Sequence, residues 1–240
     1  MKPPFYGTKV VADINAHDVA GLVDREALFA SRWQFRKNQS TGEWDKLKGD
    51  TIEPIYERLI STSIHVFEPK IIYGYFECKK QETALLVSSA GQKPRVIRFE
   101  FPRQRQTPNL CISDFFPDGF ITMQLVTIGG KVIEQGAYLF KEKKYTDVFY
   151  LKGLAAEFAE ATAEYGHRLI RKELDLPDCD GARFSFGYPS APNLADQKKL
   201  YALLEGGRIG VKLTETFQLI PEYSTSAIIS FSKEARHFRP

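Results

Sequence analysis

At the stretch KIIYGYFECKK (residues 70–80) the sequence changes to a period of two, which is typical of a β-strand. Two segments of the same kind follow it, ETALLVSS (82–89) and RVIRFEF (95–101). In the last of them apolar positions alternate with Arg98 and Glu100, as expected for a strand with one face on a core. These segments predict three consecutive strands.

Further strands are predicted closer to the C-terminus. GFITMQLVTIGG (119–130) alternates in the same way, and RIGVKLTETFQLIP (208–221) and TSAIISFS (225–232) add two more. The connection between the last two is short and contains Pro221, so we expect them to form an antiparallel pair.

Helical spacing marks most of the remaining chain. Helices are predicted over residues 23–35, 51–67, 131–144, 147–174 and 194–205, with a loop or hairpin over 37–50. Strands therefore cluster in the middle and at the end of the chain, with helices between the clusters. This segregation predicts an α+β fold with a mostly antiparallel sheet rather than a doubly wound parallel one.

The composition is that of an ordinary globular chain. Of 240 residues, 43% are hydrophobic and 26% are charged, and the length suits one large domain or two small ones. The net charge of +3 is too small to indicate nucleic acid and would suit an acidic protein partner equally well. No apolar run approaches the roughly 18 residues of a membrane span, and the first residues lack the apolar core of a signal peptide. We therefore expect a cytoplasmic protein with no membrane or nucleic-acid partner.

The motifs of several enzyme classes are missing from the sequence. It contains no glycine-rich dinucleotide fingerprint, no P-loop, and no zinc-protease or serine-hydrolase motif. Cys78, Cys111 and Cys179 are odd in number and widely spaced, which favours reduced thiols over a disulfide framework. The four histidines do not stand at ligand spacing from a cysteine or carboxylate, so no metal site is predicted.

The segment RFSFGYP (183–189) is a candidate for ligand binding. Arg183 carries a planar guanidinium that can grip a carboxylate with two hydrogen bonds. Gly187 admits a ligand close to the backbone, Tyr188 can cover it with its ring, and Pro189 fixes the loop before binding. Without further context, a surface salt bridge beside a plain turn is the simpler interpretation.

Acidic residues provide two further candidates. Glu160 and Glu164 lie four residues apart on helix 147–174, opposite its apolar stripe, and a nearby cation would relieve the repulsion between them. Such a face is usually solvated. Glu215 shares a strand face with apolar residues if 208–221 is one strand, so it needs a partner or a proton. A structural partner is the first interpretation for Glu215, and a ligand-facing role is the second.

Five stretches occur in a specific order along the chain. They are LVDREALFASRWQF (22–35), RQRQTPNLCISDFF (103–116), AEATAEYGHRLIRKE (159–173), RFSFGYP (183–189) and GVKLTETFQLIPEYSTSA (210–227). In this order they resemble the activation domain of cobalamin-dependent methionine synthase. With PPFYGTKVV (3–11) included, the resemblance covers nearly the whole chain.

The resemblance implies a single domain over residues 1–240 that binds S-adenosylmethionine, with a C-shaped α+β fold and a twisted antiparallel sheet flanked by helices. It also implies a task, the reductive methylation of cob(II)alamin on methionine synthase. The methyl group would come from S-adenosylmethionine and one electron from a flavodoxin-like donor. The corrinoid-binding motif of the other modules is absent here, so a partner domain or subunit would carry the cobalamin.

The resemblance also implies a set of ligand-binding residues. They are Asp24, Glu160, Arg183, Ser185, Gly187, Tyr188 and His237, with Glu215 as a second-tier candidate. Asp24, Glu160 and Arg183 would hold the amino-acid part of S-adenosylmethionine, and Tyr188 with the backbone of 184–188 would hold the rest. No residue is expected to act as a catalytic acid or base, because the task is to position a methyl donor.

The sequence departs from the family pattern at the ligand-binding end. Ala191 and Leu194 stand where the family continues Gly-Tyr-Pro with Cys-Pro-x-His, and His237 replaces one residue of a tyrosine pair. These changes leave two alternatives open. The chain could be a non-catalytic regulatory or interaction module of the same fold, or it could reactivate another corrinoid methyltransferase.

Overall fold

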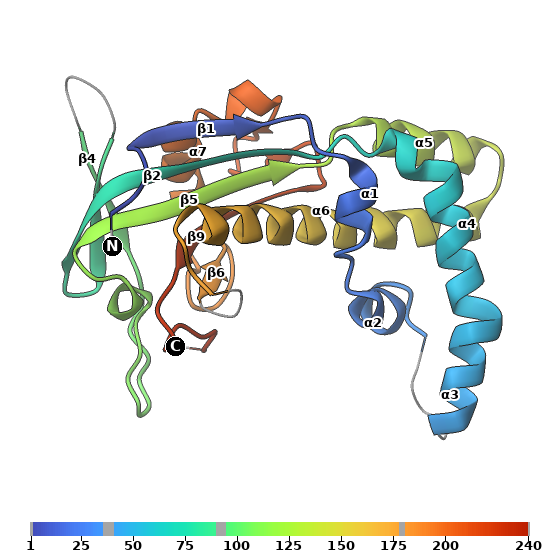
Figure 1. The fold of residues 1–240 in the computed structure, drawn as a ribbon, viewed down its shortest axis with the longest axis horizontal. Helices are drawn as coiled ribbons and strands as arrows, with labels where there is room; N and C mark the ends of the chain where they lie inside the picture. The colour runs from blue at the N-terminus through green and yellow to red at the C-terminus, as the bar shows by residue number, and fades with distance from the viewer. Residues whose placement is uncertain (1, 36–40, 90–94, 178–180, 240) are drawn as a thin grey trace.

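A seven-stranded antiparallel sheet forms the centre of the computed structural model, which describes residues 2–35, 41–89, 95–177 and 181–239 (Figure 1). Its strands follow the order β4-β3-β2-β5-β9-β6, and β1 lies beside β2. The bounds are β1 (Gly7–Val11), β2 (Lys70–Gln81), β3 (Ala84–Ser88), β4 (Val96–Glu100), β5 (Gly119–Thr127), β6 (Ala182–Phe184) and β9 (Ser224–Ser230). The predicted α+β class with an antiparallel sheet is confirmed.

The long strand β2 organises the sheet because it is paired on both edges. One edge pairs first with β1 and then with β3, and the other edge pairs with β5 over most of its length. Its side chains alternate between two cores, with Ile72 and Phe76 on one side and Ile71, Tyr73 and Tyr75 on the other. Both faces of the sheet are therefore buried along most of β2.

Helices cover the two faces of this sheet and extend beyond one end of it. They are α1 (Ala16–Ala20), α2 (Arg25–Ala27), α3 (Thr41–Leu47), α4 (Glu53–Ser63), α5 (Lys131–Lys141), α6 (Tyr145–Glu173) and α7 (Asp196–Leu204). The C-terminal half of α6 packs on the face that carries Tyr73, and α7 packs on the opposite face. Figure 1 shows α3 and α4 extending downward at one end of the sheet and the loop between β4 and β5 extending the same way at the other end, which makes the outline C-shaped.

The N-terminal half of α6 belongs to a separate, mainly helical core. Phe158 stacks on Phe67 with ring centroids 4.3 Å apart, and the Trp33 indole N–H donates to the Tyr150 carbonyl at 2.9 Å. Trp33 follows a π-helical turn over Leu28–Arg32, whose Leu28 and Phe29 are fully buried. Helix α6 therefore connects the sheet to the helical end of the molecule.

The segment 208–221 does not form the single strand that its alternation predicts. Residues Gly206–Ile209 form a 3₁₀ turn, and only two short strands follow, β7 (Lys212–Leu213) and β8 (Leu219–Ile220), which pair with each other. Strand β9 pairs with β5 and β6, so the expected pairing with 225–232 is also wrong. Glu215 lies in the exposed turn between β7 and β8, so the expectation that it sits in a buried apolar row is incorrect.

The predicted loop or hairpin over 37–50 is also incorrect for the residues that the structure describes. Residues 36–40 lie outside that part of the chain, but Thr41–Leu47 form α3 and Lys48–Ile52 continue it as a π-helix. Trp44 is buried in the helical core. Burial of this side chain outweighs the helix-breaking tendency of the two glycines in the segment.

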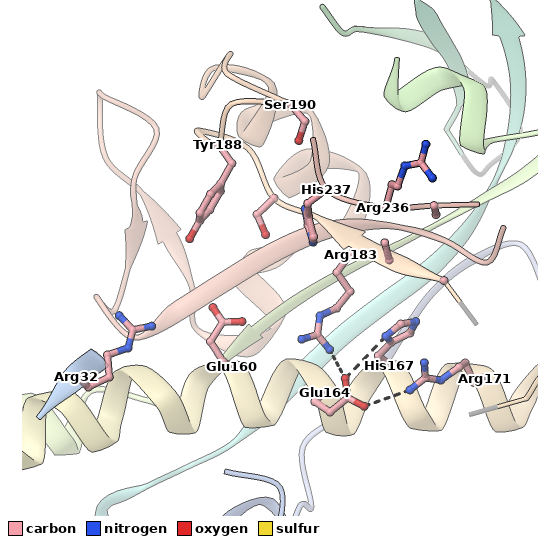
Figure 2. Close-up of a pocket in the computed structure, with 14 residues that line it drawn as sticks. Arg32, Glu160, Glu164, His167, Arg171, Arg183, Tyr188, Ser190, Arg236 and His237 are labelled. Atoms are coloured by element: carbon pink, nitrogen blue, oxygen red, sulfur yellow. Dashed lines mark hydrogen bonds and ion pairs between the residues drawn. The ribbon is translucent and has the colours of Figure 1, made fainter. Parts of the chain in front are cut away.

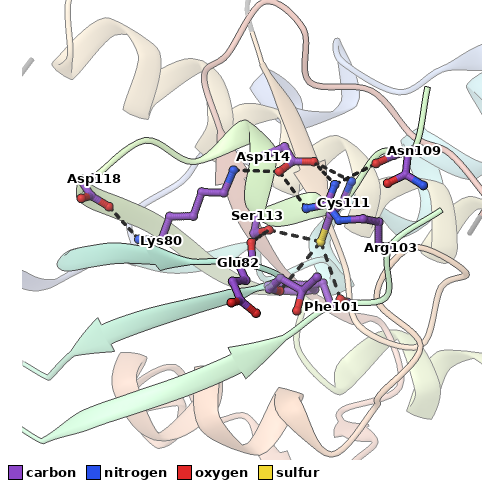
Figure 3. Close-up of polar contacts among 10 residues, drawn as sticks. Lys80, Glu82, Phe101, Arg103, Asn109, Cys111, Ser113, Asp114 and Asp118 are labelled. Atoms are coloured by element: carbon purple, nitrogen blue, oxygen red, sulfur yellow. Dashed lines mark hydrogen bonds and ion pairs between the residues drawn. The ribbon is translucent and has the colours of Figure 1, made fainter. Parts of the chain in front are cut away.

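The motif within residues 103–116 folds into a polar clamp around Asp114 (Figure 3). The Asp114 carboxylate accepts from Arg103 at 2.8 and 3.1 Å, from Lys80 at 2.8 Å and from the Cys111 backbone N–H at 3.0 Å. The hydrogen bonds from Arg103, outweighing burial, hold the Asp114 pKa well below its usual range. This clamp fixes a loop that also supports the sheet edge.

The supporting contact is made by Phe115, next to the clamp. Its ring stacks on Phe184 of β6, with centroids 5.8 Å apart and planes 6° from parallel. Its carbonyl accepts from the Ser230 hydroxyl of β9 at 2.6 Å. The loop thus packs directly beneath the short strand that carries Arg183.

A second cluster ties the end of α6 to the sheet and makes a stability prediction possible. The Glu173 carboxylate accepts from the Tyr75 hydroxyl at 2.8 Å, from the Tyr73 hydroxyl at 3.0 Å and from Lys9 at 2.9 Å.

Tyr75→Phe removes one of these donors to Glu173, and we expect a loss of about 1 kcal/mol in the free energy of unfolding. Denaturant unfolding measures this loss, and Tyr138→Phe at an exposed position is the control. Equal losses for the two variants would show that the Glu173 cluster does not stabilise the protein.

Cys78 and Cys111 are free and buried, and Cys179 lies outside the described residues. Within the part of the chain that the structure describes, no group of three or more histidine, cysteine or acidic side chains could hold a metal ion. None of the helices described there has the length and apolar character needed to cross a membrane.

Candidate ligand-binding site

A cavity of about 720 Å³ lies between α6 and the β6 edge of the sheet (Figure 2). Helix α6 forms one wall, β6 and the loop after it form another, and the C-terminal segment closes the third side. The lining residues are Arg32, Glu160, Glu164, His167, Arg171, Gly181, Ala182, Arg183, Ser185, Tyr188, Ser190, Ala235, Arg236 and His237.

Strand β6 places Arg183 in this cavity. Its three residues pair with β9, with Arg183 opposite Ile229. Gly181 precedes the strand with φ +103°, and a Cβ there would collide with the Ser230 carbonyl of β9, so only glycine allows this close approach. Arg183 extends from β6 toward α6, and its guanidinium lies between the side chains of Glu160 and Glu164 (Figure 2).

The two carboxylates of α6 have different surroundings. Glu164 accepts from Arg183 at 2.7 Å, from Arg168 at 3.0 Å and from Arg171 at 3.1 Å. Burial opposes ionisation of Glu164, but the Arg168 hydrogen bond and the Arg183 charge outweigh it, so its pKa is lowered. Among the described residues Glu160 has no hydrogen-bond or ion-pair partner, so its carboxylate is available to a ligand cation.

Four arginines and two glutamates line the cavity, which gives the lining side chains a positive charge that is partly offset by the ion pair of Arg32 with Glu157 at 3.3 Å. His167 does not add to it, because burial and the nearby Arg171 lower the pKa of His167 to about 4. The imidazole is 4% exposed and uncharged at neutral pH. An anionic group is therefore favoured near Arg183, and a cationic group near Glu160.

The loop after β6 forms the outer wall. The Gly187 N–H donates to the Ala191 carbonyl at 2.9 Å, and the Ala191 N–H donates to the Tyr188 carbonyl at 2.9 Å. Gly187 has φ +87°, a conformation that favours glycine, so it shapes the turn while its own N–H stays within the loop. Tyr188 is 61% exposed, which leaves its ring free to cover a bound molecule.

The C-terminal segment supplies the third side. His237 packs edge-on against Phe184, with ring centroids 5.3 Å apart. The neighbouring Arg236 also lines the cavity. Because Phe184 stacks on Phe115, this wall rests on the same loop that carries the Asp114 clamp.

A second cavity of about 800 Å³ adjoins the first. The two share Arg32, Glu160, Ser185 and Tyr188 as lining residues, so they form one groove along the protein. The far part of the groove is lined by the β7–β8 turn and the start of β9, together with apolar side chains such as Phe186 and Leu194. The groove therefore has a charged part around Arg183 and a part with more apolar side chains.

The structure brings most of the predicted site residues together. Glu160, Arg183, Ser185, Tyr188 and His237 all line the first cavity. Three others do not line either cavity: Asp24, Gly187 and Glu215. Asp24 is the N-cap of α2, where its side chain accepts from the Ala27 N–H at 2.9 Å, and Glu215 is exposed in the β7–β8 turn. The ligand-binding roles of all these residues stay predictions.

Several lining residues were not expected from the sequence. Arg32 and Arg236 carry no local signal, since each is one arginine among many charged residues. The sequence predicts a solvated face on α6 opposite its apolar stripe, yet two residues of the cavity side of this helix, His167 and Arg171, are at least 95% buried. The like-charge spacing of Glu160 and Glu164 was the one feature of the sequence that indicated nearby cations.

Comparisons with known proteins agree with this architecture. The chain is 34% identical to methionine synthase of Mycobacterium tuberculosis (strain ATCC 25618 / H37Rv) over 278 aligned positions, and 31% identical to methionine synthase of Mycobacterium leprae (strain TN) over 274. Each alignment covers 98% of this chain and 23% of the mycobacterial protein. The chain thus spans about a quarter of the length of these relatives.

A solved structure has the same fold. The crystal structure of the MetH reactivation domain bound to AdoHcy superposes with a TM-score of 0.84 at 20% identity, covering 100% of this chain and 83% of that one. The family model for the activation domain of vitamin B12-dependent methionine synthase matches residues 17–239. This chain therefore belongs to the family of methionine synthase activation domains.

Proposed function

We propose that this chain binds S-adenosylmethionine and supports the reductive methylation of cob(II)alamin on a cobalamin-dependent methionine synthase. The observation that carries the proposal is the cavity that combines Arg183 and Glu160 with Ser185, Tyr188 and His237. The related solved domain is bound to AdoHcy, which is the product left when S-adenosylmethionine gives up its methyl group. Residues 1–240 would act as one domain in this role.

The charges of the cavity match the amino-acid end of the proposed ligand. Its carboxylate would bind the Arg183 guanidinium, whose N–H groups are only partly used by Glu164. Its α-ammonium would bind Glu160, which has no competing partner among the described residues. Because Asp24 caps α2 and lies outside the cavity lining, Glu160 is the principal acid in this proposal.

The nucleoside end would lie toward the shared part of the groove. Tyr188, with its exposed ring, would cover the adenosine, and Ser185 and His237 would contact it from the loop after β6 and from the C-terminal segment. The sulfonium would then be left uncovered, so that its methyl group would be accessible to a reduced cobalamin carried by a partner domain. The chain's own contribution is to hold and orient the methyl donor.

Ligand-dependent thermal stability tests the binding step. S-adenosylmethionine at about ten times its Kd would stabilise the native state by about 1.4 kcal/mol, since it binds only the folded chain. For a protein of this size the midpoint would rise by about 3–6 °C. No rise at millimolar ligand would instead favour a regulatory or interaction module of the same fold.

The methyl-transfer step needs a separate experiment. The chain is mixed with a corrinoid module in the cob(II) state, S-adenosylmethionine and a flavodoxin-like reductant, and methylcobalamin is followed by absorbance. We expect its formation to depend on both S-adenosylmethionine and the chain. Binding without methyl transfer to a methionine synthase module, but with transfer to another corrinoid module, would assign the chain to a different methyltransferase.

A further inference from the structure

Glu164 is the centre of a cluster of charged side chains at the inner end of the cavity, which we call the Glu164 cluster (Glu164, His167, Arg168, Arg171 and Arg183). One carboxylate oxygen accepts from Arg168 at 3.0 Å and from Arg171 at 3.1 Å. The other accepts from Arg183 at 2.7 Å and lies 4.0 Å from His167 Nδ1 (Figure 2). Four of the five members come from α6, and Arg183 alone comes from the sheet.

The three arginines of the cluster differ in how far their side chains are buried. The Arg171 side chain is 6% exposed and Arg183 is 23% exposed, whereas Arg168 is 56% exposed. Arg168 and Arg171 are fixed to Glu164 through the helix itself, at spacings of four and seven residues. Arg183 reaches across the cavity from a strand of three residues, and among the described residues Glu164 is the ion-pair partner of its guanidinium.

We propose that Glu164 is the positioning residue that holds the Arg183 guanidinium ready for the ligand carboxylate. The inference rests on the proposed function and extends it to a residue that does not itself bind the ligand. An arginine side chain has many rotamers, and ordering it before the ligand arrives removes that cost from binding. With Nη1 on Glu164, the remaining N–H groups of Arg183 are left for the ligand.

Glu164 also has an opposite effect on binding, because its negative charge repels a ligand carboxylate. Three guanidiniums surround that charge at hydrogen-bond distance, so its field toward the ligand is cancelled. Without Glu164 the Arg183 guanidinium would lose its ion-pair partner among the described residues, and the side chain would be free to move toward solvent. The positioning effect therefore exceeds the repulsion, and loss of Glu164 weakens binding.

The test compares two ligands that differ only in the carboxylate. Affinities of Glu164→Gln for S-adenosylmethionine and for decarboxylated S-adenosylmethionine are measured by calorimetry on the full chain. We expect about tenfold weaker binding of S-adenosylmethionine, which corresponds to ~1.4 kcal/mol, and a change within about twofold for the decarboxylated ligand. Glu164→Asp, which keeps a carboxylate near buried Arg171 but is one methylene shorter, is a second variant, and we expect it to fold and to show the same selectivity.

Glu173→Gln is a matched control on the same helix. Glu173 is also a partly buried carboxylate that accepts from a lysine and from two other side chains, but it does not line the cavity. We expect this variant to lose thermal stability and to keep both affinities within about twofold.

The outcomes distinguish the inference from the function on which it rests. If Arg183→Ala weakens S-adenosylmethionine binding but both Glu164 variants bind it normally, the inference is wrong and the proposed function stands. Equal losses for the two ligands would also overturn it, because a purely structural residue would not select for the carboxylate. If the unmodified chain does not bind S-adenosylmethionine at all, the proposed function fails and the inference fails with it.

Discussion

Arg183→Ala is expected to weaken S-adenosylmethionine binding about 100-fold, or ~2.7 kcal/mol. The change removes the cation proposed to bind the ligand carboxylate, whose side chain is 23% exposed in the cavity. It also leaves the Glu164 carboxylate with one partner fewer, so that its repulsion of the ligand is less completely cancelled. Calorimetry with the full chain measures the effect directly.

Arg58→Ala is the control for this variant. Arg58 makes a single ion pair with Asp147 at 2.7 Å and lies outside both cavities. Its removal is expected to leave the affinity unchanged within about twofold, because exposed ion pairs contribute little. If the two variants lose similar affinity for S-adenosylmethionine, Arg183 does not bind the ligand, and the proposed contact between Arg183 and the ligand carboxylate is wrong.

Asp114→Ala is expected to lower the free energy of unfolding by about 2–3 kcal/mol. The carboxylate accepts charged hydrogen bonds from Arg103 and Lys80 and satisfies the Cys111 backbone N–H, and its loss leaves all three without this partner. Chemical denaturation measures the change. Because Phe115 stacks on Phe184, a loosened clamp is also expected to disturb β6.

Asp147→Ala provides a comparison at similar exposure, since the Asp147 side chain is 25% exposed and that of Asp114 is 27% exposed. Because Asp147→Ala removes one ion pair, we expect it to lower the free energy of unfolding by less than about 1 kcal/mol. The pH dependence gives a second check. The folded pKa of Asp114 is lowered, so its stabilising contribution is complete above the unfolded value of about 3.9 and declines as pH falls below it. If Asp114→Ala destabilises the protein equally at pH 7 and in strong acid, the clamp is not electrostatic.

The sheet was predictable because its alternation is set by burial. In β2, β5 and β9 the side chains alternate between two cores, and in β3 and β4 one face packs on a core, so a period of two is visible in the sequence. The segment 208–221 has the same period but lies where Gly210 and Phe217 adopt positive φ, which breaks it into two short strands. A period describes which side chains could share a face and says nothing about where the backbone turns.

The candidate site was predictable only in part, because its walls come from distant segments. The motif resemblance pointed to Glu160, Arg183, Ser185, Tyr188 and His237, and the structure gathers these in one cavity. The local sequence of α6 suggested a solvated polar face, because nothing in it shows that β6 and the C-terminal segment cover that face. Asp24 caps the N-terminus of α2, so its position is explained without a contact to a ligand.

Helix α6 is in contact with the rest of the protein on almost every side. Leu154 and Phe158 pack into the helical core and Ile170 into the sheet core, while Glu160 and Glu164 line the cavity between them. Substitutions on this helix are therefore restricted both by packing against the two cores and by the charges that line the cavity. Related chains that acquire a new ligand preference would change first across the groove, in the turn around Tyr188 and in the segment around His237, where substitutions leave the interior intact.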